Sequence, residues 1–299
     1  MEKNNKRWKG FLGSVPPIVW MMIIMLVLFS AAADNYLSAQ ILMNILRQSV
    51  PLLILAIGQT MIVLTGGTDL SLGAQVSFVT VMWILLAQAG MNIYLAAPVA
   101  VCFAVLIGVA NGLLVSTGKV PAFIATFGMQ NIVNSIALVL TLGSSIYFSH
   151  QVFRNVYESE FLMIPAPIWI AVAVFAGSWI LLYRTQFGTN IFGLGGNAEA
   201  LSLAGVNTTK YYVKTYAFAG LLAGIAGLIT ACRVESGQPP VGSGWEFEAG
   251  AATILGGTSL NEGRGGNGRT VLGVLVLNMP RNGGHLLARS GEYPEHHHR

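Results

Sequence analysis

Long runs without charged residues decide what this chain can fold into. About 20 apolar residues cross a hydrocarbon core about 30 Å thick. Stretches predicted to hold at least one span are Gly10 to Ala33, Gln48 to Thr68, Val120 to Ser149, Phe161 to Tyr183 and Thr215 to Cys232, and Leu70 to Gly118 holds two spans around Gly90-Met91-Asn92. Ala249 to Asn261 and Thr270 to Pro280 are too short to cross alone, which predicts broken or partial spans. The expected fold class is therefore all-α, a polytopic bundle of transmembrane helices.

Composition supports a bundle rather than a single anchor. Only 9% of the residues are charged, whereas an ordinary soluble domain has about 25%. The 35 glycines are typical of membrane helices whose backbones approach closely. The net charge of +4 comes from dispersed lysines and arginines, without the basic stripe of a nucleic-acid surface. We expect one membrane domain over residues 1–280, a polar tail over 281–299 and no nucleic-acid partner.

The distribution of basic residues predicts the orientation. A cytoplasmic amino terminus with alternating spans places ten basic residues inside and three outside, as the positive-inside rule requires. The basic residues inside are Lys3, Lys6, Arg7, Lys9, Lys119, Arg184, Lys210, Lys214, Arg264 and Arg269, against Arg47, Arg154 and Arg233 outside. The external loops are expected to carry the carboxylates Asp34, Glu158, Glu160, Glu235 and Glu246.

The basic start followed by Ile18 to Phe29 and Ala31-Ala32-Ala33 also fits a cleavable signal peptide. An uncleaved first span is preferred, because the charge-free run covers 24 residues from Gly10 to Ala33 and further spans follow.

Asp69 is an ionisable residue between two apolar runs, in the segment Thr65-Gly66-Gly67-Thr68-Asp69-Leu70-Ser71-Leu72-Gly73. An aspartate inside a membrane costs about 2.5–3.5 kcal/mol, so it usually faces a bundle interior, a water-filled cavity or a partner. The flanking glycines allow the helix to break. Asp69 is therefore either a pathway residue or the cap of a cytoplasmic turn that accepts backbone N–H bonds; both roles are compatible.

This segment resembles the GG-x-DLS-x-GA signature of the permeases of ribose-type sugar ABC importers. Three further blocks are similar to that family: Lys119-Val120-Pro121-Ala122-Phe123-Ile124-Ala125-Thr126, then Phe187 to Asn197 with Ala200 and Ala204-Gly205-Val206, and Leu255-Gly256-Gly257-Thr258-Ser259-Leu260 with Gly263 and Gly265. The resemblance covers about residues 45 to 277. It implies a type II importer-like fold with broken helices in a bacterial inner membrane. The implied partners are a second permease copy or homologue, two ATP-binding cassette ATPase subunits, and a periplasmic or extracellular sugar-binding protein.

The predicted cytoplasmic loop 184–212 contains a short helix, Ala198 to Ala204. Asn197 is its expected N-cap, Glu199 lies in its first turn and Gly205 is its C′ residue. Leu201, Leu203 and Ala204 need a partner surface. The resemblance implies that this is the coupling helix that docks onto the ATPase, and the residues assigned to coupling are Asn197, Glu199, Ala200, Leu201, Leu203 and Gly205. The alternative is a connector that skims the membrane without a partner.

This chain is expected to bind no cofactor, because it has no G-x-x-x-x-G-K-[ST] loop for ATP and magnesium, which the partner ATPase would hold. No catalytic constellation or metal site emerges, so an enzyme is not expected. An ion-coupled secondary transporter needs a membrane-buried carboxylate, for which Asp69 is the one candidate from the sequence.

Polar residues on one predicted helical face mark a solute path. Thr126, Gln130 and Asn134 recur every four residues, with Asn131 and Ser135 beside them. Sugar hydroxyls need such donors and acceptors, although interhelical hydrogen bonding explains them equally well. The candidate pathway residues are Gln59, Asp69, Ser71, Asn111, Thr126, Gln130, Asn131 and Asn134, and Thr60 carries the same ambiguity.

Two glycine pairs, Gly108 with Gly112 and Gly220 with Gly224, predict helix-packing seams.

The family pattern stops matching after about Leu277, where complete final spans are expected. Arg281 to Arg299 is too polar to cross a membrane. A frameshift, a premature stop or a truncated gene would explain this departure.

Overall fold

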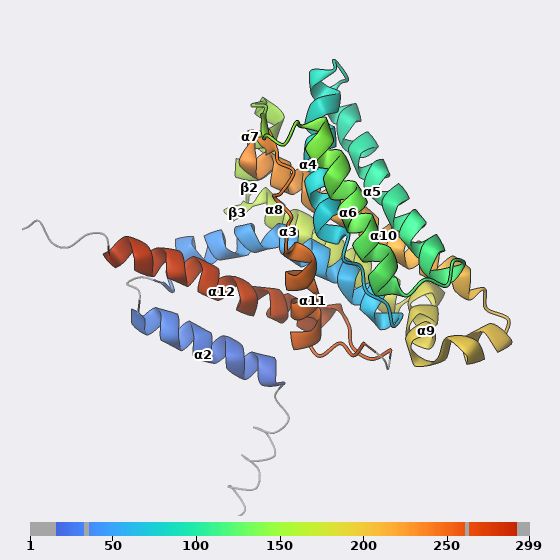
Figure 1. Ribbon diagram of the computed structural model, residues 1–299. Helices are drawn as coiled ribbons and strands as arrows, with labels where there is room; N and C mark the ends of the chain where they lie inside the picture. Colours follow the sequence, from blue (N-terminus) through green and yellow to red (C-terminus); the bar gives the residue numbers. More distant parts are fainter. Residues whose placement is uncertain (1–15, 33–35, 261–262, 292–299) are drawn as a thin grey trace, which may run out of the picture.

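The computed structural model describes residues 16–32, 36–260 and 263–291, with backbone alone over 282–291. Helices form almost all of the regular structure (Figure 1). The helices are α2 (Pro17–Ala32), α3 (Ala39–Leu64), α4 (Leu72–Gln88), α5 (Ile93–Ser116), α6 (Ala122–Leu140), α7 (Gln151–Glu158), α8 (Ala166–Tyr183), α9 (Gln186–Leu203), α10 (Thr208–Val234), α11 (Trp245–Leu255) and α12 (Asn267–Gly291). Four two-residue strands pair as β1 (Ile146–Tyr147) with β4 (Ser236–Gly237), and β2 (Glu160–Phe161) with β3 (Ile164–Pro165).

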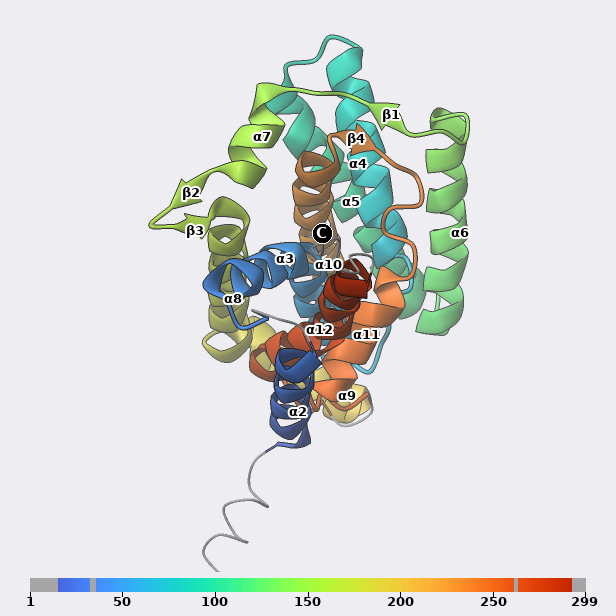
Figure 2. The same ribbon diagram turned by 90° about the vertical axis from the view of Figure 1, so that its left-hand side faces the viewer.

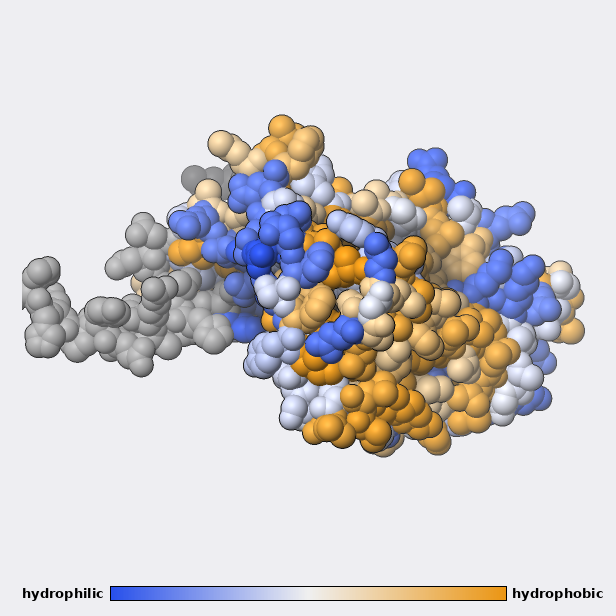
Figure 3. Space-filling model, turned by 90° about the horizontal axis from the view of Figure 1, so that it is seen from above, coloured by the Kyte–Doolittle hydropathy of each residue, from blue (hydrophilic) through white to orange (hydrophobic). Residues whose placement is uncertain are grey.

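The predicted spans correspond to helices in the described part of the chain. Five helices, α3, α5, α6, α8 and α10, are long and apolar enough to cross a membrane, and α2 and α4 are shorter apolar helices. These seven match the seven predicted spans. The protein is therefore a multi-pass membrane protein with an all-α fold, and the face in Figure 3 carries a broad hydrophobic area interrupted by several separate groups of hydrophilic side chains.

Several helix boundaries differ from the predicted ones. Helix α3 begins at Ala39, nine residues before Gln48, and includes Arg47, whose guanidinium lies 5.2 Å from the centre of the Tyr157 ring. Helix α12 continues through Pro280 to Gly291 instead of ending near Pro280. A charge-free run marks the part of a helix in hydrocarbon, whereas the backbone hydrogen bonds continue into the headgroup region.

Helix α10 lies at the centre of the bundle and packs closely on α5. A side chain at Gly108 or Gly112 would collide with the backbone of α10, and one at Gly220 would collide with the backbone of α5. At Gly224 a side chain would collide with Val101 of α5. The two predicted glycine seams are therefore confirmed, and they face each other across one interface.

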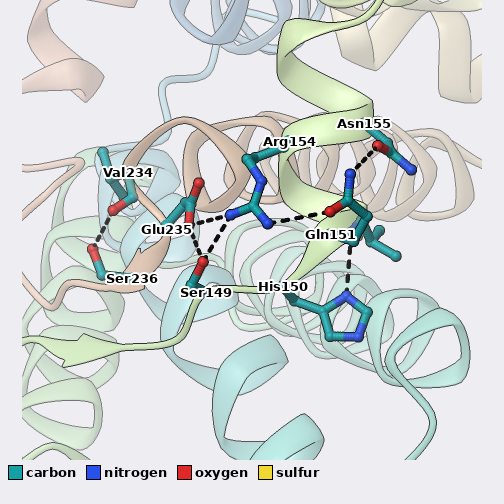
Figure 4. Close-up of polar contacts among 9 residues, drawn as sticks. Ser149, His150, Gln151, Arg154, Asn155, Val234, Glu235 and Ser236 are labelled. Carbon is teal, nitrogen blue, oxygen red and sulfur yellow. Dashed lines mark hydrogen bonds and ion pairs between the residues drawn. The ribbon is translucent and has the colours of Figure 1, made fainter.

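A strap between α6 and α8, residues 146–165, crosses one end of the bundle (Figure 2). Its β1 strand pairs with β4, and its helix α7 is tied to the end of α10 by Arg154, which lies 3.6 Å from Glu235. Ser149 donates to Glu235 at 2.6 Å and accepts from Arg154 at 3.0 Å, as Figure 4 shows. The run Val120 to Ser149 thus holds one membrane helix followed by the start of this strap.

Candidate functional site

The helical structure is interrupted between α3 and α4 at the centre of the bundle, and we call this non-helical segment the break. Helix α3 ends at Leu64, Gly66 adopts a φ of 78°, and α4 begins at Leu72. Gly67 fits only without a side chain, because a Cβ there would collide with the hydroxyl of Tyr216. Non-helical backbone at membrane depth is tolerated only where protein or a polar cavity satisfies its polar groups, so the surroundings of this break decide its role.

Asp69 is completely buried in the break. Its Oδ1 accepts hydrogen bonds from the backbone N–H of Ser71 at 2.8 Å and from the Ser71 hydroxyl at 2.6 Å. Its Oδ2 accepts from Asn111 Nδ2 of α5 at 3.1 Å. The expected backbone hydrogen bond is therefore present, but it lies inside the bundle instead of in a solvated turn. Every donor to this carboxylate is uncharged.

Ser71 and Asn111 complete the cluster around Asp69. The Ser71 hydroxyl also accepts from Asn111 Nδ2 at 2.8 Å and from Gln75 Nε2 at 2.9 Å. Both lone pairs and the proton of this hydroxyl are thus used. The break is fixed to α5 through side chains that are all fully buried.

Side chains from three further helices bind the remaining polar groups of the break. The Thr126 hydroxyl of α6 accepts from the backbone N–H of Leu70 at 3.1 Å. The Tyr216 hydroxyl of α10 donates to the carbonyl of Thr68 at 3.2 Å, and Gln59 Nε2 of α3 donates to the hydroxyl of Thr68 at 3.1 Å. Four predicted pathway residues, Asp69, Ser71, Asn111 and Thr126, therefore meet at one point, with Gln59 beside them. We name the side chains of Asp69, Ser71, Asn111 and Thr126 the Asp69 cluster.

A second buried carboxylate lies at the start of α11. Glu246 is only 2% exposed and accepts from Gln130 Nε2 of α6 at 2.7 Å. The expectation that Glu246 belongs to an external loop is wrong, and Asp69 is not the only carboxylate inside the bundle. The short helix α11 packs between α3 and α12, and this carries its first turn inward. An acidic residue is favoured in the first turn of a helix. The sequence therefore did contain a signal that Glu246 lies at a helix N-terminus.

The polar residues predicted to share one side of α6 fall into a buried group and a more exposed group. Thr126 and Gln130 make the buried contacts described above. Asn131 lies on the exposed side and donates to the carbonyl of Phe127 in its own helix at 2.8 Å. Asn134 is half-buried, and Ser135 is exposed. The structure therefore does not bring Asn131, Asn134 or Ser135 to the Asp69 cluster.

Five buried oxygen atoms near these groups have no hydrogen-bond partner among the described residues. They are Gln59 Oε1, Gln75 Oε1, Asn111 Oδ1, Gln130 Oε1 and Glu246 Oε2. All five are acceptors, and an unpaired buried acceptor costs about 1–3 kcal/mol. Each of these oxygens can accept a hydrogen bond from a hydroxyl group or from water.

Three threonines join α3, α11 and α12. The Thr60 hydroxyl lies 3.1 Å from that of Thr253 and 2.8 Å from that of Thr270, and all three side chains are fully buried. Thr60 was ambiguous from the sequence, and its contacts here are interhelical hydrogen bonds. Thr253 and Thr270 were not anticipated, because single threonines in apolar runs give no signal of their partners.

The predicted loop 184–212 is mostly helical. Helix α9 begins at Gln186 and is interrupted at Asn197, which has a non-helical φ of −162°. Asn197 Oδ1 accepts from the backbone N–H of Ala200 at 2.8 Å, and Gly205 has a φ of 86°. The predicted N-cap and C′ residues are confirmed. Leu203 is 84% exposed, so the second segment of α9 presents an apolar side chain without a partner in the described chain.

The first segment of α9 packs directly on the membrane helices. A side chain at Gly195 would collide with the carbonyl of Leu64, the last residue of α3. A side chain at Gly263 would collide with Phe192 and Gly196 of α9. The first segment of α9, which leads into the exposed segment, is therefore in direct contact with the end of α3, the helix that enters the break at Asp69.

The comparisons agree with this architecture. Ribose import permease protein RbsC of Escherichia coli K12 is 34% identical over 276 residues, covering 91% of this chain and 86% of the relative. RbsC of Bacillus subtilis 168 is 34% identical over 297 residues, covering 98% of this chain and 91% of the relative. The D-allose transport system permease protein AlsC of Escherichia coli K12 is 30% identical, covering 89% and 82%. No solved structure gives a significant match.

A family described as the permease component of the branched-chain amino acid transport system matches residues 41–295. The match continues beyond Leu277, where the sequence motifs alone ceased to agree. With the multi-pass helices, the broken segment at Asp69 and the identities above, the chain belongs to this family of transport permeases.

Proposed function

We propose that this chain forms the solute path of a sugar importer in a bacterial inner membrane, and that separate ATPase subunits supply the energy. The observation that carries the proposal is the 34% identity to ribose import permeases over 91% of the chain. A relative named for D-allose adds a second sugar. The amino terminus is proposed to be cytoplasmic, as the distribution of basic residues predicts.

The buried polar groups favour a sugar over an amino acid, the substrate in the family description. An amino acid carries a carboxylate that needs cationic or N–H donors. The charged side chains buried in the described part of the chain are the carboxylates of Asp69 and Glu246, and no lysine or arginine is buried there to bind the carboxylate of an amino acid. Sugar hydroxyls are donors that match such acceptors.

The contact between Gln130 and Glu246 is proposed to close the path between α6 and α11. Its 2.7 Å hydrogen bond joins α6, which is long and apolar enough to span a membrane, to the short helix α11. Gln130 Oε1 and Glu246 Oε2, which have no partner among the described residues, belong to the same two side chains. A solute that passes here separates the two side chains and donates its hydroxyls to the released acceptors. The Asp69 cluster keeps the non-helical segment between α3 and α4 in its conformation during this movement.

Glu248 provides a matched control for Glu246, because it lies in the same helical turn but pairs with Arg281 at the surface at 2.8 Å. In proteoliposomes with the partner ATPase and binding protein, Glu246→Gln should reduce ATP-driven ribose uptake by about 10-fold or more, since a sugar hydroxyl that donates to the charged carboxylate gains about 1.5–3 kcal/mol and the neutral amide is a weaker acceptor. Glu248→Gln should retain uptake close to that of the unchanged chain. Equal uptake by the two variants would remove Glu246 from the path.

The exposed segment of α9 is proposed to dock onto the ATPase. Its residues Asn197, Glu199, Ala200, Leu201, Leu203 and Gly205 form a capped short helix. Gly195, in the segment of α9 just before the kink at Asn197, contacts the end of α3, and this contact gives movement of the docked segment a route to the Asp69 cluster. A binding protein would deliver the sugar on the opposite face, where the strap of residues 146–165 lies. Co-purification of the chain with an ATPase subunit tests the first partner.

The alternative is transport driven by an ion gradient, for which the two buried carboxylates Asp69 and Glu246 are the specific support. It predicts that a proton or sodium gradient drives uptake without ATP. It also predicts that Asp69→Asn abolishes this coupling. ATP-driven uptake that persists after all ion gradients are collapsed would exclude it.

A further inference from the structure

A cavity of about 400 Å³ lies between α3, α8 and α12. Its walls are almost entirely apolar and include Leu46, Val50, Ile168, Phe175, Val271 and Leu275. The one polar side chain in its wall, Ser49, already donates to the carbonyl of Ile45 at 2.7 Å. Leu46 and Val172 at its margin are exposed on the surface of the spanning helices α3 and α8. The cavity therefore offers an occupant dispersion contacts and no hydrogen bond.

A second cavity of about 400 Å³ adjoins the first at Gly268, which lines both. It is lined by Tyr183, Gly257, Arg264, Gly265, Gly266 and Arg269 in addition to Gly268. A Cβ at Gly268 would meet no atom within 4 Å, so the space above this residue is open. The two cavities share Gly268 in their walls, and we refer to them together as one site with an apolar end and an end with two arginines.

The backbone of α12 adds to the positive potential of the second cavity. Helix α12 begins at Asn267, and its first N–H groups have no acceptor within the helix. Such a terminus favours an anion. Asn267 itself is fully buried, and neither Nδ2 nor Oδ1 has a hydrogen-bond partner among the described residues. Asn267 lines neither cavity, so the start of α12 contributes its first N–H groups and the charge of Arg269 to the second cavity.

Aromatic residues place the second cavity at headgroup depth. Tyr183, in its wall, lies 5.5 Å from Trp179 between ring centroids, and Arg184 lies 5.6 Å from the centre of the Trp179 ring. Tryptophan and tyrosine concentrate at the boundary between hydrocarbon and water. The arginine end of the site is thus at the level of lipid phosphates, and the apolar end is in the hydrocarbon.

We propose that this site binds an anionic phospholipid. Its phosphate lies against Arg264, Arg269 and the first turn of α12, and one acyl chain fills the apolar cavity. A free phosphate would use only the arginine end, whereas a phospholipid accounts for the junction of the two cavities at Gly268. Basic pockets between membrane helices are known to hold anionic headgroups. The glycine-rich loop 263–266 also contacts α9, so the lipid would stabilise the loop that supports α9.

The test measures lipid that remains bound to the purified full-length chain in detergent, by native mass spectrometry, after reconstitution with equal amounts of phosphatidylglycerol and phosphatidylcholine. The unchanged chain should retain phosphatidylglycerol in preference. Arg269→Gln should lower the affinity about fivefold, and the double variant Arg264→Gln/Arg269→Gln should lower it further, since each basic residue near an anionic surface contributes about that factor. Lys119→Gln is the matched control, because Lys119 is exposed and lines neither cavity.

Two further arms separate the possible occupants. Val271→Trp fills the apolar cavity without changing charge, and it should also reduce retention. Arg269→Lys keeps the charge and should retain most of the lipid, which controls for misfolding of the glutamine variants. Equal retention of both lipids would overturn the proposal. Full retention by the double variant, or displacement of the bound anion by inorganic phosphate with no effect of Val271→Trp, would also overturn it.

Discussion

Replacement of Asn111 by alanine tests the Asp69 cluster in the most direct way. Asn111 Nδ2 lies 3.1 Å from Asp69 Oδ2 and 2.8 Å from the hydroxyl of Ser71. Interhelical hydrogen bonds in membranes average about 0.6 kcal/mol, so the two contacts together contribute about 1.2 kcal/mol. Asp69 Oδ2 then has no donor among the described residues, which adds about 1–3 kcal/mol. Removal of Asn111 Oδ1, which has no partner among the described residues, offsets part of this cost, so the free energy of unfolding should fall by about 1–3 kcal/mol.

The measurement is reversible unfolding in mixed micelles by titration with sodium dodecyl sulfate, followed by tryptophan fluorescence. Asn134→Ala is the matched control, because Asn134 is a half-buried asparagine on the neighbouring helix α6; its effect should stay within about 0.5 kcal/mol. In a chain that already carries Asp69→Asn, Asn111→Ala should lower the free energy of unfolding by about 1 kcal/mol or more less than it does in the unchanged chain, because the acceptor at position 69 is then uncharged. Equal costs for Asn111→Ala and Asn134→Ala, or strict additivity with Asp69→Asn, would refute the reasoning.

Three further predictions concern packing, the strap and the exposed helix. Gly220→Ala forces a methyl group into the backbone of α5 and should lower the free energy of unfolding by about 1–3 kcal/mol. Gly128→Ala, whose added Cβ meets no atom within 4 Å, should raise it by about 0.5–1 kcal/mol. The opposite order in the same unfolding assay would contradict the glycine seam. Arg154→Ala should cost less than about 1 kcal/mol because the ion pair with Glu235 is solvent-exposed, and a loss several times larger would show that the strap holds the bundle together. Leu203→Asp should leave unfolding unchanged and weaken binding of the ATPase by about tenfold or more, as measured by pull-down; undiminished binding would remove Leu203 from the docking surface.

The sequence predicted the membrane helices and their close contacts well, because both depend on local composition. Charge-free runs identified each helix in the described part of the chain that is long and apolar enough to span a membrane, since hydrocarbon excludes charge regardless of neighbours. Gly108 and Gly220 marked the α5 and α10 interface, because only small residues allow such an approach. Asn197 and Gly205 were identified as caps because their geometry is fixed within one turn of chain.

The site itself was only partly predictable, because burial depends on which segments pack together. Glu246 follows a loop after α10, and only the position of α11 against α3 and α12 turns it inward toward Gln130. Thr126 and Asn131 were both assigned to the path from the sequence, yet the orientation of α6 buries Thr126 and exposes Asn131. Thr253 and Thr270 gain meaning only from their contacts with Thr60, which lies about 200 residues earlier in the chain.

ATP-driven accumulation of ribose tests the central claim most directly. The chain is reconstituted in proteoliposomes with its ATPase and binding protein, ion gradients are collapsed with ionophores, and uptake of labelled ribose is followed with ATP present or absent. We expect ATP-dependent accumulation that Glu246→Gln reduces and Glu248→Gln does not. No accumulation with ATP, under conditions in which RbsC of Escherichia coli transports ribose, would contradict the account, as would uptake driven by an ion gradient alone.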